Sequence, residues 1–99
     1  MPLSSQQVRK LRGLAHSLKV IVIVGGNGLT DNVRHEIDEA LGRHELLKVR
    51  VKAEDRDERD EVIKDMCEQA GAALIQRIGH VAVLYRRNPE NPRVDPGKR

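Results

Sequence analysis

The sequence predicts an α+β sandwich with the element order α-β-α-β-α-β-β, in which three helices accompany a four-stranded mixed sheet. Segments with helical apolar spacing alternate with short runs rich in β-branched residues, and two strands linked by a glycine turn come last. The 99 residues suffice for one domain. They are too few to cover both faces of the sheet with helices, so we expect one face to stay largely open.

The first helix is expected over about residues 5–17. Ser4 and Gln7 have the spacing of a capping box, which marks the helix start. The residues with helical apolar spacing are Val8, Leu11, Leu14, Ala15 and Leu18. A cationic stripe flanks this apolar face and consists of Arg9, Arg12, His16 and Lys19.

The first strand, Val20–Val24, is an unbroken β-branched run that ends at the glycine loop Gly25, Gly26, Asn27 and Gly28. A second helix begins directly after this loop, with Thr30 or Asp31 as its cap. We expect positive φ angles at Gly25 and Gly28. Glycines before a helix start leave outward-pointing N–H groups, so the loop can bind an anion, although a tight turn alone also needs glycine.

The second strand has two chemically different faces. Leu47, Val49 and Val51 alternate with a row of cations formed by Lys48, Arg50 and Lys52. We expect this strand to pair in parallel with Val20–Val24, because the helix between them forms a right-handed crossover. The cationic face is therefore either solvated or bound to an anionic partner.

A third helix and a hairpin complete the domain. The helix ends at Gly71, and its apolar face consists of Val62, Ile63, Met66, Cys67 and Ala70. Strands over residues 73–78 and 81–85 pair antiparallel through Gly79 and His80, with glycine first as a type II′ turn requires. We place a domain over residues 1–87 and a flexible basic tail over residues 88–99, which is rich in proline and polar residues.

The charge is segregated along the chain. Residues 1–52 carry nine basic and five acidic groups (+4), residues 53–71 carry three and eight (−5), and residues 72–99 carry six and two (+4). A basic surface facing RNA is expected, with the acidic helix turned away from it. Tyr85 is the only aromatic residue of the Phe, Tyr and Trp types. Ring stacking on splayed bases is therefore disfavoured, and contact with the RNA backbone is favoured.

The single Cys67 and the absence of a leader or a long apolar run lead us to expect a soluble, cytoplasmic monomer that does not enter a membrane. A nucleotide-binding enzyme remains an alternative, since a strand, a glycine turn and a helix also begin a dinucleotide fold, with Glu54 near the ribose position. The loop lacks the full G-x-G-x-x-G pattern and a P-loop lysine. We predict no catalytic residue, no metal, no cofactor and no small-molecule substrate.

Three blocks resemble a known family. Leu11–His16, Val24–Thr30 and Leu47–Val51 are similar to the CRM domain (chloroplast RNA splicing and ribosome maturation) in its stand-alone, YhbY-like bacterial form, over roughly residues 3–87. The resemblance implies an RNA-binding domain like the C-terminal domain of bacterial initiation factor three, with a GxxG loop, acting on ribosomal RNA of large-subunit precursors. The family loop usually reads Gly-Lys-x-Gly, and here Gly26 stands at the lysine position.

The expected RNA-binding residues combine the loop with nearby cations. They are Gly25, Gly26, Asn27, Gly28, Arg9, Arg12, Lys19, Lys48 and Arg50. If the first helix packs back along the first strand, the end with Arg9 and Arg12 lies near the glycine loop. A module that binds acidic proteins during ribosome assembly remains open beside the RNA-binding interpretation.

Overall fold

The computed structural model describes residues 3–90 and 92–97, and it confirms the predicted α+β class and order of elements. The elements are α1 (Ser5–Ala15), β1 (Val20–Val24), α2 (Asp31–His44), β2 (Leu46–Val51), α3 (Arg56–Ala70), β3 (Ala73–Ile78) and β4 (Val81–Tyr85). The four strands lie in the order β1-β2-β4-β3. None of the helices in this part of the chain is long and apolar enough to cross a membrane.

The sheet is mixed, as predicted. β1 pairs with β2 in parallel, and β4 pairs antiparallel with both β2 and β3. In the parallel ladder Val20 lies opposite Lys48 and Ile23 lies opposite Arg50. The β3–β4 turn has Gly79 at a φ of 56°, which is the sign required at the first turn position.

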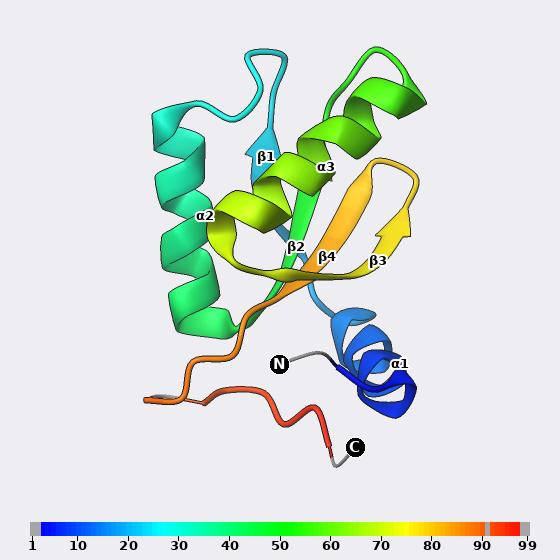
Figure 1. Cartoon of the computed structure of the whole chain (residues 1–99), viewed down its shortest axis with the longest axis vertical. Helices are drawn as coiled ribbons and strands as arrows, with labels where there is room; N and C mark the ends of the chain where they lie inside the picture. Colours follow the sequence, from blue (N-terminus) through cyan, green and yellow to red (C-terminus); the bar gives the residue numbers. More distant parts are fainter. Residues whose placement is uncertain (1–2, 91, 98–99) are drawn as a thin grey trace.

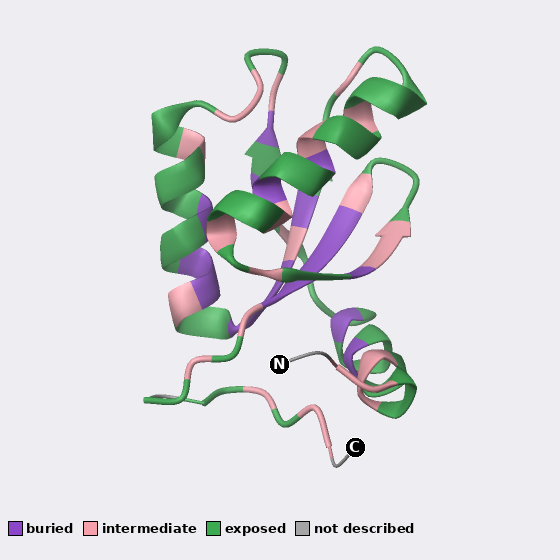
Figure 2. Ribbon diagram, in the orientation of Figure 1, coloured by how far each residue is buried: buried purple, intermediate pink, exposed green. Residues whose placement is uncertain are grey.

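The two faces of the sheet are covered unequally (Figures 1 and 2). α2 and α3 cover one face, and the larger core lies there around Leu47, Val49 and Val51. On the other face α1 covers only one end, where Leu11 and Ala15 bury against β2, β3 and β4. We call the remainder the open face; its residues are Ile21, Ile23, Lys48, Arg50 and Ile78.

The helix ends follow local capping chemistry. Ser4 and Gln7 form the predicted capping box, and the Thr30 side chain caps α2 by accepting from the Val33 N–H. α1 stops at Ala15, short of the expected residue 17, because the chain turns there to enter β1. Asp55 caps α3, and the acidic residues Asp57 and Glu58 in its first turn suit the positive end of the helix.

The tail returns to the domain through Glu45. This glutamate follows α2, has a φ of 62° and is 0% exposed. Its carboxylate accepts backbone N–H groups from Asn88, Arg93 and Val94. The division into a domain of residues 1–87 and a flexible tail of residues 88–99 stays a prediction, and residues 1–2, 91 and 98–99 lie outside the described residues.

The electrostatics of Glu45 follow from these contacts. Burial by itself raises the pKa of this carboxyl group, but the three backbone donors and the charge of Arg87 outweigh it. The net result is a pKa below the usual value of about 4.5. A carboxylate whose pKa is lower in the folded than in the unfolded chain stabilises the fold above the unfolded pKa. That contribution is lost as the pH falls through the folded pKa.

Replacing Glu45 with Gln tests this contact. We expect Glu45→Gln to lower the free energy of unfolding by roughly 2 kcal/mol near neutral pH, because it removes charge-assisted hydrogen bonds and turns an amide donor toward N–H groups. Urea unfolding at a series of pH values should show the difference shrinking as the pH falls below about 4.5. Glu90→Gln, at an exposed position, is the matched control. A pH-independent difference would contradict the role of the charge.

Candidate nucleic-acid interface

The glycine loop presents two backbone donors at its tip. The Gly28 N–H donates to the Gly25 carbonyl at 3.0 Å and closes the turn, and Gly28 has a φ of 72°. Gly25 has no positive φ, so that part of the expectation is wrong, and the turn needs only one left-handed residue. Gly26 and Asn27 are exposed, and in the described chain no backbone carbonyl accepts their N–H groups.

The loop leads directly into the positive end of α2. Thr30 satisfies the Val33 N–H at 3.2 Å, and the remaining dipole of the helix end favours a negative group nearby. Asp31 in the first turn offsets part of this potential, with Arg34 at 3.8 Å from it. Both side chains are largely exposed, so their ion pair is weak and leaves Arg34 available to a phosphate.

Cations at the end of β2 flank the loop. The Lys52 N–H donates to the Val24 carbonyl at 2.9 Å, which brings this end of β2 beside the start of the loop. Arg50 lies opposite Ile23 in the same ladder. Arg50, Lys52 and His80 line a shallow cavity of about 300 Å³. Arg50 and Lys52 thus lie in the part of β2 that runs beside the end of β1, next to the start of the loop.

Other predicted cations lie at the opposite end of the sheet. Lys48 is opposite Val20, so it lies near Lys19 at the beginning of β1. Arg12 donates to the Ile75 carbonyl at 3.4 Å and lines a cavity of about 520 Å³ that includes Lys48. Arg9 is exposed on α1.

The expectation that Arg9 and Arg12 lie near the glycine loop is wrong. Figure 1 shows the loop at the top of the molecule and α1 at the bottom. The reason is the second core, in which α1 packs against Leu46 and Ile75 rather than along β1. The two groups of cations therefore lie toward opposite ends of the open face, with Lys48 in one group and Arg50 in the other.

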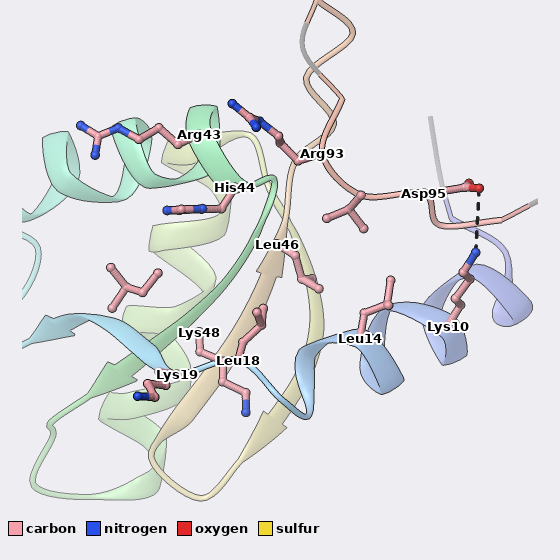
Figure 3. A pocket seen from close by; sticks show the side chains of 12 residues that line it. Lys10, Leu14, Leu18, Lys19, Arg43, His44, Leu46, Lys48, Arg93 and Asp95 are labelled. Carbon is pink, nitrogen blue, oxygen red and sulfur yellow. Dashed lines mark ion pairs between the residues drawn. The ribbon is translucent and has the colours of Figure 1, made fainter.

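Sequence reasoning missed three cations that lie near Lys19 and Lys48. Lys10, Arg43 and Arg93 come from α1, the last turn of α2 and the tail, and they line one cavity (Figure 3). The position of Arg43 in the last turn of α2 was readable from the sequence. The return of Arg93 was not, because it depends on the buried contact with Glu45.

The acidic segment lies on the far side of the sheet. α3 packs on the face opposite to Lys48 and Arg50, so the charge segregation of the sequence becomes a segregation in space. An extended anion can contact the loop and the open face without approaching the carboxylates of α3.

Two observations concern the thiol and the possible metal ligands of the described residues. Burial raises the pKa of the Cys67 thiol to about 11, so it stays protonated at neutral pH. No group of three or more His, Cys, Asp or Glu side chains in residues 3–90 and 92–97 is placed to hold a metal ion. The fold and its surface thus define a small α+β domain whose glycine loop exposes two residues with backbone N–H groups that no backbone carbonyl of the described chain accepts.

Comparison with known proteins identifies the family. The CRS1/YhbY (CRM) domain model matches residues 3–86, and the chain belongs to this family. An RNA-binding protein of Haemophilus influenzae is 47% identical over 88 residues, which cover 89% of each chain. A Pseudomonas aeruginosa protein named a probable RNA-binding protein is 39% identical over 90 residues, 91% of this chain and 86% of the other.

A solved structure agrees with the fold. The solution structure of a Staphylococcus aureus protein proposed to bind RNA has a TM-score of 0.82 and 34% sequence identity. The match covers 95% of this chain and 98% of that one. The names of these relatives thus refer to RNA-binding proteins and not to enzymes.

The cations of β2 give a quantitative test. Changing Lys48 and Arg50 together to Ala should flatten the dependence of log affinity on log salt for a structured ribosomal RNA fragment by roughly two, at about one per phosphate contact. The measurement is a titration at several salt concentrations. Arg56→Ala with Lys64→Ala removes the same charge from exposed positions of α3 and should leave the slope unchanged. An unaltered slope in the β2 variant would show that Lys48 and Arg50 face solvent and do not contact phosphates of the RNA.

Proposed function

We propose that this protein binds RNA without catalysing a reaction, and that the glycine loop contacts the RNA backbone. The observation that carries the proposal is the pair of N–H groups on the exposed residues Gly26 and Asn27, which have no backbone acceptor in the described chain. The loop leads into the positive end of α2 and starts beside the end of β2 that carries Arg50 and Lys52. An RNA strand can approach the tip closely because no large side chain stands there. The names of the relatives support the same partner.

The composition supports backbone contact over base stacking. Binding of the RRM type requires exposed aromatic rings on a sheet. Tyr85, the single aromatic residue, is only 5% exposed and packs under α1. The open face instead offers aliphatic side chains and two cations, which suit sugars, phosphates and the apolar surface of a base. Affinity should therefore depend strongly on salt.

The RNA we propose is ribosomal RNA in precursors of the large subunit, bound by a monomer in the cytoplasm. The support is the family resemblance of the three sequence blocks. Crosslinking in cells followed by sequencing of the bound RNA tests this directly. We expect reads concentrated at one region of large-subunit ribosomal RNA. Reads dispersed over messenger RNAs would refute the ribosomal target and leave RNA binding itself intact.

One observation favours contact with protein instead. Ile21, Ile23 and Ile78 are 56%, 53% and 58% exposed on the open face, and apolar residues of this size also mark protein interfaces. A pull-down with and without nuclease separates the two functions. An association that requires RNA disappears after nuclease treatment, whereas a direct protein contact survives it. For the nucleotide-binding alternative, ligand-observed NMR with ATP and NAD should show no binding.

Two carboxylates at the loop tip should abolish or greatly weaken RNA binding while the domain stays folded. In the variant Gly26→Asp with Asn27→Asp, repulsion acts on phosphates, and the positive end of α2 tolerates the new charges. The backbone permits the change, since neither residue has a positive φ and a Cβ at Gly26 meets no atom within 4 Å. Thermal unfolding beside an RNA titration at matched salt measures both effects. Wild-type affinity in a folded variant would show that the loop is only a turn.

The opposite substitution should strengthen binding. Gly26→Lys puts a cation where the family resemblance leads us to expect one, and the open space around Gly26 accommodates it. We expect the affinity for the same ribosomal RNA fragment to rise several-fold at low salt, and the salt slope to steepen by about one. Gly26→Met, of similar length without charge, is the control. Equal behaviour of the Lys and Met variants would contradict phosphate contact at the tip.

A further inference from the structure

A groove lies at the end of the sheet opposite to the glycine loop (Figure 3). It has a volume of about 730 Å³, within the range of about 300–1,000 Å³ typical of ligand sites. Its walls come from α1, the start of β1, β2, the end of α2 and the tail. We call it the basic groove. The basic groove is a separate site from the glycine loop, because the length of β1, roughly 17 Å at 3.3 Å per residue, lies between them.

The charge of the groove selects an anion. Five cations line it: Lys10, Lys19, Arg43, Lys48 and Arg93. Asp95 is the only carboxylate among the lining residues, and it lies 3.9 Å from Lys10. Glu39 pairs with Arg43 at 3.6 Å from outside the groove. Both pairs are between exposed side chains, so a phosphate group can replace either carboxylate at small cost.

The floor of the groove is aliphatic. Leu14, Leu18 and Ile21 are 41%, 39% and 56% exposed, and Val94 completes the lining from the tail. A blunt RNA duplex offers phosphates and riboses to the cations but leaves such a floor uncovered. An unpaired nucleotide offers phosphate together with a planar base, whose faces pack on apolar side chains. The combination of cations and aliphatic floor therefore fits an unpaired nucleotide.

The groove is continuous with the proposed RNA-binding surface. Lys48 lines the groove and also belongs to the open face, and Arg50 follows two residues later toward the glycine loop. An RNA whose backbone lies on the loop reaches the groove along β1. This continuity favours RNA over an acidic segment of another protein, because a single RNA molecule can then contact both the glycine loop and the basic groove.

We propose that the basic groove holds an unpaired nucleotide of the RNA whose backbone the glycine loop contacts, an inference that rests on the proposed function. The tail is part of this site. Arg93 and Val94 form one wall because their N–H groups donate to the buried carboxylate of Glu45. The protein thereby reads an RNA that combines a structured backbone at the loop with an unpaired base at a fixed distance from it.

Two RNA probes and three variants test the groove. The probes are a hairpin with an oligouridine loop and the blunt duplex of its stem. Lys10→Ala with Arg43→Ala removes two groove cations, Leu14→Ser with Leu18→Ser removes the floor, and Arg56→Ala with Lys64→Ala is the charge-matched control on α3. Thermal unfolding checks that each variant is folded.

We expect wild type to prefer the hairpin over the duplex several-fold. The cation variant should flatten the salt slope for the hairpin by about two. The floor variant should remove the preference for the hairpin without changing the slope, and the control should behave as wild type. The cation variant alone decides the outcome should the floor variant unfold.

Failure of the groove and failure of the proposed function have different signatures. If wild type binds both probes and the cation variant matches its affinity and slope for the hairpin, the groove inference falls while RNA binding by the loop stands. If wild type binds neither probe at low salt, the proposed function falls and the inference with it. If the cation variant keeps its hairpin affinity but loses binding to a polyglutamate peptide, the occupant is an acidic protein segment and the inference is overturned.

Discussion

The alternation along β2 is the constraint on which the architecture depends. β2 is a central strand that pairs in parallel with β1 and antiparallel with β4, so the direction of each of its side chains is fixed by two ladders. Leu47, Val49 and Val51 enter the core under α2 and α3. A shift of one residue would bury Lys48 and Arg50 there without partners, at a cost of several kcal/mol for each charge. The pattern therefore determines both the register and which face stays open.

Glu45 extends this constraint to the tail. Its N–H donates to Leu41 at the end of α2, its carbonyl accepts from Arg86 after β4, and its carboxylate accepts from the tail. One residue thus joins the end of a helix, the start of a strand and a segment more than 40 residues away. Its positive φ strains a residue with a Cβ, and the buried hydrogen bonds compensate for that strain. The wall of the basic groove formed by Arg93 depends on this arrangement.

The fold was largely predictable because its signals are local. Each strand shows a β-branched or alternating run, and the glycine turn at Gly79 specifies the hairpin. The acidic first stretch of α3 was also predictable, since carboxylates such as Asp57 and Glu58 suit the positive end of a helix. Strand order and the position of α1 depend on which apolar residues meet across the sheet. Leu11 packs against Ile75, 64 residues later in the chain, and no periodicity encodes such a pair.

The candidate site also has parts that local sequence patterns predict and parts that depend on contacts between distant segments. The loop from Gly25 to Gly28 and the cations of β2 follow from short sequence patterns, whereas the groove needs α1, the end of α2 and the tail to meet. Gly26 belongs to the part that the sequence predicts, and it leaves the loop tip without a side-chain cation. Backbone N–H groups alone give a short-range, directional contact, so affinity must come from cations spread over the rest of the surface. For the RNA ligand proposed above, this arrangement favours recognition of RNA shape over the whole surface, because no single contact is strong enough to bind any strand that reaches the loop.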